Sequence, residues 1–156
     1  MKTSIIVFLA FIAITSAEEW KLKTMEEWSQ IHKTCDERFP VSAELIEKAK
    51  VEKYPPKEVF EVVLCILRGV EVWDDTKGFS TDRIMFGLEN VAKRENLSKQ
   101  FLRDGIEHCK DSNSEGSSTL DWAYRWFKCF KDNEPLFKAI REVKLYKERE
   151  RKIQEE

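Results

Sequence analysis

Residues 59–70, VFEVVLCILRGV, decide the fold of this chain because they leave almost no polar face. A helix that is apolar all round has to be covered by neighbours on several sides. Tyr54-Pro55-Pro56 stands just before this stretch, and the turn-forming run DDTKG, residues 74–78, follows it. The pattern therefore predicts a central helix over residues 57–70.

Helical spacing of apolar residues continues on both sides of this central helix. The chain of 156 residues has only five glycines and four prolines, and no stretch alternates in the manner of a strand. Residues suited to begin helices recur along it: Thr24 with Glu27, Ser42, Ser98, Ser118 with Asp121, and Asn133 with Pro135. We expect a compact all-α domain of six to seven helices.

The chain has four cysteines, separated by 29, 43 and 19 residues: Cys35, Cys65, Cys109 and Cys129. An even number in a short secreted chain favours two disulfides, and four cysteines allow three pairings. His32 and His108 lie close to cysteines, but zinc sites usually pair cysteines about two to four residues apart. We therefore expect a disulfide-linked domain without a metal or a cofactor, and without a reactive thiol.

The two ends of the chain differ from its middle. Residues 1–17, MKTSIIVFLAFIAITSA, combine a basic Lys2 with an apolar run and small residues, the layout of a cleaved secretory signal. The apolar run is too short to span a bilayer, so we expect no stable membrane insertion. Residues 147–156, KERERKIQEE, are nearly all charged and are predicted to be a frayed helix or a disordered tail. The domain itself is expected over residues 18–146, in an extracellular fluid.

Composition argues against several functions. The net charge is −2, and −3 once Lys2 is removed with the signal, which argues against binding to nucleic acid or an anionic membrane surface. The chain has no glycine-rich phosphate loop, no GxSxG motif and no nucleophile beside a suitable base. We therefore expect a binding protein and not an enzyme. Asn96-Leu97-Ser98 is a glycosylation sequon, although Ser98 would also serve simply as a helix cap.

Aromatic residues make up 12% of the chain, including five tryptophans. Any single aromatic residue more often belongs to a core than to a binding site. Together with two disulfides in a small helical domain, they favour an enclosed apolar pocket. The residues predicted to line this pocket and contact a ligand are Phe60, Leu64, Leu67, Phe86, Phe101, Leu102, Trp122, Trp126, Phe127, Phe137 and Ile140.

The cysteine spacing resembles that of insect odorant-binding proteins of the pheromone and general odorant type. Members of this family have six helices and six cysteines, paired first to third, second to fifth and fourth to sixth. With the four cysteines here aligned as first, third, fourth and sixth, Glu61 and Leu120 fall at the missing second and fifth positions. Because those two positions are partners, the chain resembles the four-cysteine branch, which lacks one whole bridge.

Two further segments support the resemblance, which spans residues 20–146: WDDTKGF at residues 73–79 and LDWAYRWFKCF at residues 120–130. The resemblance implies the pairings Cys35–Cys65 and Cys109–Cys129. It also implies a carrier of small hydrophobic molecules, such as odorants, pheromones, fatty acids or similar lipids, in a fluid such as sensillum lymph or haemolymph. On this reading the protein is a monomer or weak dimer, with a membrane receptor as a further candidate partner.

Alternatives and finer expectations accompany this reading. A secreted interaction protein on the same fold, with a protein partner and a filled core, is the main alternative. A secreted hydrolase is a weaker alternative, because the chain lacks a nucleophile and a base.

Without a link between Glu61 and Leu120, we expect a more deformable pocket that accepts a broader range of ligands. The last helix is predicted to cover one mouth of the pocket through Phe137, Ile140 and Val143.

Overall fold

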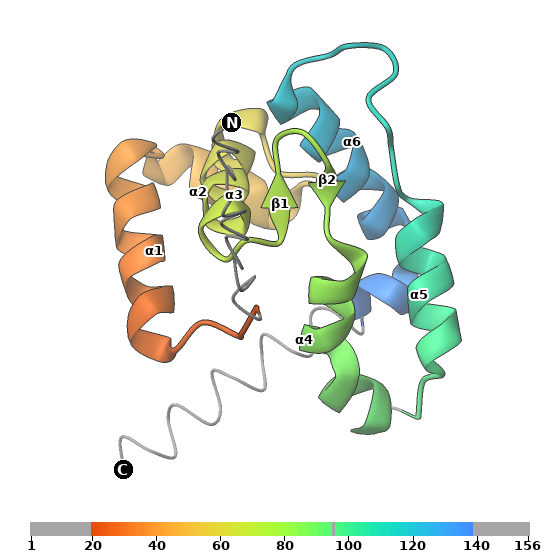
Figure 1. Ribbon diagram of the computed structural model, residues 1–156. Coiled ribbons are helices and arrows are strands. Elements are labelled where there is room, and N and C mark those ends of the chain that lie inside the picture. The colour runs from red at the N-terminus through yellow and green to blue at the C-terminus, as the bar shows by residue number, and fades with distance from the viewer. Residues whose placement is uncertain (1–19, 95, 139–156) are drawn as a thin grey trace, which may run out of the picture.

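The computed structural model describes residues 20–94 and 96–138 (Figure 1). Its elements are α1 (Met25–Arg38), α2 (Ala43–Val51), α3 (Lys57–Gly69), β1 (Trp73–Asp74), β2 (Gly78–Phe79), α4 (Thr81–Arg94), α5 (Lys99–His108) and α6 (Thr119–Asp132). Residues 134–138 are also helical. The prediction of an all-α domain with six to seven helices is confirmed. The predicted signal sequence, the charged tail, Ile140 and Val143 lie outside the described residues.

Helix α3 is the centre of the arrangement, as its apolar sequence predicts. It contacts α1, α2, β1 and α6, while α4 packs against α5 (Figure 1). Phe60 and Leu64, one turn apart on α3, are buried. The most apolar stretch of the chain is therefore the one that most other elements cover.

Polar side chains begin four helices at the positions that the sequence indicates. Thr24 and Glu27 form a complete capping box at the start of α1. Ser42, Ser98 and Ser118 each accept a hydrogen bond from a backbone N–H in the first turn of α2, α5 and α6. A cap of this kind contributes about 1 kcal/mol to stability. These local contacts explain why the helix starts are readable in the sequence.

The sequon lies in the turn between α4 and α5. Asn96 is exposed and has a φ of 51°, in the left-handed region. The Ser98 hydroxyl accepts a hydrogen bond from the Phe101 backbone N–H at 2.9 Å. The role of Ser98 as a cap is confirmed, and glycosylation of Asn96 stays a prediction.

The sequence pattern does not indicate the two short strands that flank the predicted turn. They pair in antiparallel fashion, with Trp73 opposite Phe79. The Asp74 carboxylate accepts two backbone hydrogen bonds within the turn, at 2.8 and 2.9 Å, and Gly78 adopts a φ of 75°. Two residues per strand are too few for an alternating pattern to be visible. The hairpin nevertheless matters, because it places both aromatic rings in the core.

Two disulfides cross-link the helices. Cys35–Cys65 joins α1 to α3 across a Cα–Cα distance of 5.7 Å, and Cys109–Cys129 joins the end of α5 to α6 across 5.5 Å. The pairing that the resemblance implies is confirmed. Because all four sulfurs are in bridges, none of them can act as a zinc ligand or a nucleophile.

Polar contacts join α6 to the start of α3 and to the residues just before it, and no disulfide links α3 to α6. Asp132, at the end of α6, has its Oδ1 atom 2.6 Å from both the Lys53 ammonium and the Tyr54 hydroxyl. Lys57, in the first turn of α3, pairs with Asp121 in the first turn of α6. We refer to these five residues as the α3–α6 clamp.

Helices α1 and α3 approach closely at Gly69, which generates a first prediction. A Cβ atom at Gly69 would lie 2.5 Å from Cγ2 and 3.2 Å from Cγ1 of Ile31. Ile31 is β-branched and has one preferred rotamer in a helix, so α1 itself would have to move. We expect Gly69→Ala to lower the free energy of unfolding by about 1–3 kcal/mol, measured by urea denaturation of the oxidised protein.

The matched control for this substitution is Gly87→Ala on α4. Apart from its own neighbours in the chain and the backbone of α4, no atom of the described residues lies within 4 Å of a Cβ at Gly87. Alanine favours a helix over glycine by about 1 kcal/mol, so Gly87→Ala should be neutral or stabilising. Adding Ile31→Ala to Gly69→Ala should remove the clash, so that the two changes are not additive. Equal effects of the two glycine substitutions would contradict the close approach of α1 and α3.

The α3–α6 clamp generates a prediction about acid stability. Hydrogen bonds from Lys53 and Tyr54 lower the pKa of Asp132 below its ordinary value of 3.8, and those from Lys57 and Ser118 lower the pKa of Asp121. A carboxyl group whose pKa is lowered by folding stabilises the protein above its unfolded pKa, and this is lost as pH falls through the folded pKa. We expect the urea midpoint to decline below about pH 4.

Asparagine variants test whether the clamp causes this decline. Asp132→Asn should make the loss of stability between neutral and acidic pH smaller than in the unchanged protein. Asp36→Asn, at an exposed position of α1, is the control and should leave the decline as it is. An unaltered acid decline in Asp132→Asn would show that the clamp does not contribute.

Candidate ligand-binding region

The apolar interior lies between α3, the hairpin and α6. Phe60, which is fully buried on α3, has its ring centroid 5.1 Å from those of Tyr124 and Phe127 on α6. Trp73 of β1 meets Trp122 of α6 edge to face, with centroids 4.8 Å apart. Such aromatic pairs add about 0.5–1.5 kcal/mol each beyond the burial of their area. These rings belong to one apolar cluster that joins the elements.

Hydrogen bonds orient two of the buried tryptophans in this cluster, Trp73 and Trp122. The Trp122 indole N–H donates to the backbone carbonyl of Asp111 at 2.6 Å, and that of Trp73 donates to Asp75 at 2.7 Å. Arg125 donates to the Asp111 carboxylate at 2.7 Å, which lowers the pKa of Asp111. These bonds anchor the polar loop before α6 to α6 itself, the helix that also carries Trp122.

Seven of the eleven residues predicted to contact a ligand lie in or against this cluster. Five are buried and two are half-buried: Phe60, Leu64, Leu102, Trp122 and Trp126, then Leu67 and Phe127.

The other four predicted residues lie elsewhere. Phe137 is half-buried, with the Lys131 ammonium 4.5 Å from its ring centroid. Phe86 on α4 and Phe101 on α5 are 54% and 40% exposed, and Ile140 lies outside the described residues. Contact of any of the eleven with a ligand stays a prediction.

Half-buried apolar side chains show where the described residues leave the interior incompletely covered. Leu67 of α3 and Ile84 and Met85 of α4 pack against the core cluster but are only partly buried. Trp28 and Ile31 of α1 are also half-buried. These side chains belong to two packed pairs of helices, α1 with α3 and α4 with α5, which lie on different sides of the molecule (Figure 1).

Sequence reasoning missed Trp20, the first described residue. Its ring packs edge to face on Phe86 of α4, with centroids 5.7 Å apart, and the Arg83 guanidinium lies 5.5 Å from its ring centroid. Lys23, three residues later, pairs with Glu71 at 2.7 Å. The sequence shows only a lone tryptophan just after the predicted signal. It gives no sign of the ring contacts of Trp20, because Arg83 and Phe86 come more than sixty residues later.

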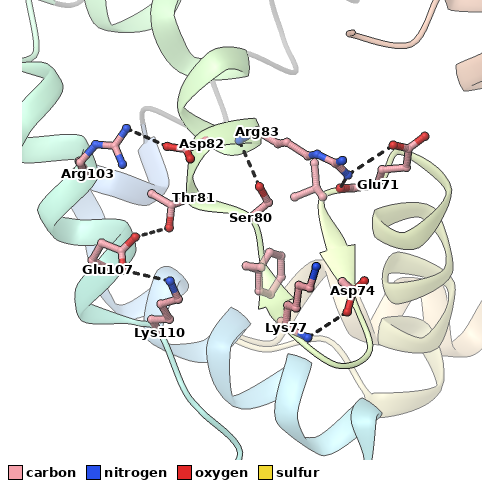
Figure 2. A pocket seen from close by; sticks show the side chains of 13 residues that line it. Glu71, Asp74, Lys77, Ser80, Thr81, Asp82, Arg83, Arg103, Glu107 and Lys110 are labelled. Atoms are coloured by element: carbon pink, nitrogen blue, oxygen red, sulfur yellow. Dashed lines mark hydrogen bonds and ion pairs between the residues drawn. The ribbon is translucent and has the colours of Figure 1, made fainter. Parts of the chain in front are cut away.

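A cavity of about 390 Å³ lies between the hairpin, α4 and α5 (Figure 2). Its charged side chains are largely paired: Arg103 Nη2 lies 3.0 Å from Asp82 Oδ1, and Lys110 Nζ lies 3.4 Å from Glu107 Oε2. Thr81 also donates to Glu107, and these bonds lower the pKa of Glu107. None of the predicted ligand-binding residues that the structure describes lines this cavity. Its polar lining does not suit an apolar ligand.

A smaller cavity of about 190 Å³ lies between α4 and α5. Met85, Phe86 and Ala92 form its apolar side, and the pair Glu89–Lys99, 2.6 Å apart, lies on its charged side. Ligand pockets usually measure about 300–1,000 Å³, so this cavity is too small for a long apolar molecule.

The described part of the chain lacks the features of two other kinds of protein. Over residues 20–94 and 96–138, no three or more His, Cys, Asp or Glu side chains are grouped so as to hold a metal ion. No helix in these ranges is long and apolar enough to cross a bilayer.

A small helical domain with two disulfides, an aromatic interior and partly covered apolar faces is typical of a binding protein. Residues 17–133 match the PBP/GOBP family. The chain therefore belongs to this family, whose members are odorant-binding carriers and not enzymes. The two observed disulfides agree with the four-cysteine pattern.

Known relatives span most of the chain. It is 30% identical over 141 residues to odorant-binding protein 22 of Aedes aegypti, which covers 89% of this chain and 96% of the relative. It is 27% identical over 133 residues to general odorant-binding protein 99b of Drosophila melanogaster, covering 81% and 89%. General odorant-binding protein 99a of the same fly is 25% identical over 127 residues, covering 79% and 87%.

Proposed function

We propose that this protein is a secreted carrier that binds small hydrophobic molecules in an extracellular fluid and releases them unchanged. Membership of the PBP/GOBP family supports the class of function. The observation that carries the proposal is the set of apolar side chains on α1, α3 and α4 that the described residues leave only half-buried. An apolar ligand placed against them would complete their burial.

The strength of such binding follows from the area that leaves water. Burial of apolar surface contributes about 25 cal/mol per Å². A ligand that removes roughly 400 Å² from water would gain about 10 kcal/mol, and micromolar affinity needs about 8 kcal/mol. Association also costs at least about 4 kcal/mol in lost freedom of motion, so a ligand has to remove roughly 500 Å² or more from water to reach micromolar affinity, and no covalent step is required.

Binding of a fluorescent probe tests the proposal. The oxidised protein should bind a hydrophobic naphthylamine dye saturably, and long-chain alcohols, esters or fatty acids should displace it. Reduction and alkylation of both disulfides should abolish this binding, which controls for dye adsorbed on exposed apolar surface. Absence of saturable binding by the oxidised protein would contradict the carrier function and favour a protein partner.

An engineered disulfide tests whether the missing bridge broadens the range of ligands. Positions 61 and 120 adjoin the contact between α3 and α6, because Phe60 packs on Tyr124 and Lys57 pairs with Asp121. Glu61→Cys with Leu120→Cys should restrict how these helices separate. We expect fewer of a fixed panel of ligands to displace the dye than with the unchanged protein.

The control for the engineered bridge is Glu61→Ala with Leu120→Ala, which removes both side chains without a link. It should keep the range of ligands of the unchanged protein. If mass spectrometry shows the new bridge and the range does not narrow, deformability at this contact does not set the selectivity.

A further inference from the structure

The fold does not use the side chain of Asn96, in contrast to those of two other asparagines. Asn113 exchanges hydrogen bonds with Ser117, at 2.9 and 3.1 Å, and Asn133 caps the helical residues that follow it. Asn96 is exposed, and its amide group forms no hydrogen bond with any of the described residues. The amide is therefore open to chemical modification.

The backbone at Asn96 does not require an asparagine side chain. Its φ of 51° lies in the left-handed region, and the Leu97 N–H donates to the Ala92 carbonyl at 2.9 Å, the bond that closes a Schellman motif at the end of a helix. Glycine is the usual left-handed residue of this motif, and asparagine is less common there. The turn alone thus leaves the choice of asparagine unexplained.

Ser98 is also more specific than its structural role demands. Its hydroxyl oxygen accepts the Phe101 backbone N–H at 2.9 Å and so begins α5. Serine, threonine, aspartate and asparagine all serve well as such a cap, but only serine or threonine completes a glycosylation sequon with Asn96. The cap and the sequon can therefore be separated by substitution.

The position of the sequon suits a large polar group. Figure 1 shows the end of α4 and the start of α5 at the opposite end of this helix pair from the hairpin. Ser98, Lys99 and Gln100 are exposed, as is Asn96. A bulky group on Asn96 would extend into water without displacing any element of the fold.

We propose that Asn96 carries an N-linked glycan in the secreted protein. The inference rests on the secretion that the proposed function includes, because this sugar is added during export. The side-chain nitrogen of Asn96 forms a bond to the anomeric carbon of an oligosaccharide carried on a polyprenyl diphosphate. The bond between sugar and phosphate breaks, the polyprenyl diphosphate leaves, and the amide nitrogen loses one proton.

A glycan at this position limits which surface can meet a protein partner. Phe101, in the first turn of α5, is 40% exposed. Because an N-linked glycan is bulky and polar, it would occupy the space beside this ring. The end of the α4–α5 pair would then be closed to other proteins.

The mass of the secreted protein provides the test. The full chain, with its own residues 1–17, is expressed in cultured insect cells and recovered from the medium. We expect an intact mass that exceeds the polypeptide with two disulfides by one oligosaccharide. A glycosidase that cleaves the amide linkage should remove the excess and, in heavy-oxygen water, leave a labelled aspartate at position 96.

Substitutions at Ser98 separate the sequon from the cap. Ser98→Asp keeps a good cap and removes the sequon, whereas Ser98→Thr keeps both. We expect the excess mass in Ser98→Thr, and none in Ser98→Asp or in Asn96→Asp, which tolerates the left-handed backbone.

The outcomes distinguish this inference from the proposed function. A secreted protein with the bare polypeptide mass overturns the glycosylation and leaves the carrier function standing. Absence of the chain from the medium overturns its secretion, and with it this inference. Excess mass that persists in Asn96→Asp would show that the sugar is attached elsewhere and would overturn the assignment.

Discussion

The two disulfides impose a division on which the rest of this structure depends. One bridge holds α1 on α3, and the other holds the end of α5 on α6. Each cross-link reduces the conformational entropy mainly of the unfolded chain. The pair α1 and α3 and the pair α5 and α6 are therefore each stabilised, and we call these pairs the two halves of the domain. The contact between the halves, where α3 meets α6, has no covalent link. The aromatic rings around Phe60 hold it together, and the exposed ion pairs of the α3–α6 clamp add a smaller contribution.

Local physical chemistry explains why so much of the fold could be predicted. Thr24, Ser42 and Ser98 cap helices through bonds within a few residues, so the sequence alone carries the information. The sequence of α3 likewise indicates its central position, because the helix has no polar face that could be exposed to water. The hairpin escapes such reasoning, since its two-residue strands depend on the burial of Trp73 and Phe79 by distant helices.

The candidate site was less predictable because burial depends on contacts between distant parts of the chain. Phe86 and Phe101 look equivalent to Phe60 in the sequence, yet they lie on faces of α4 and α5 that are partly exposed. Trp20 shows the opposite case. Its environment comes from Arg83 and Phe86, which helical periodicity cannot connect to an isolated residue before the first helix. Sequence reasoning therefore identifies the apolar residues but not the contacts that distinguish core from surface.

The non-covalent contact between the halves has a consequence for ligand entry. The ion pairs of the α3–α6 clamp are largely exposed, and such pairs contribute little to stability. Most of the attraction there comes from apolar contact between rings such as Phe60 and Phe127. If an apolar ligand enters near this contact, the rings exchange contact with the opposite helix for contact with the ligand. Because both contacts are apolar, the net free-energy cost of separating the two helices is small. In the carrier proposed above, this unbridged contact would therefore be the place where the interior adapts to a ligand.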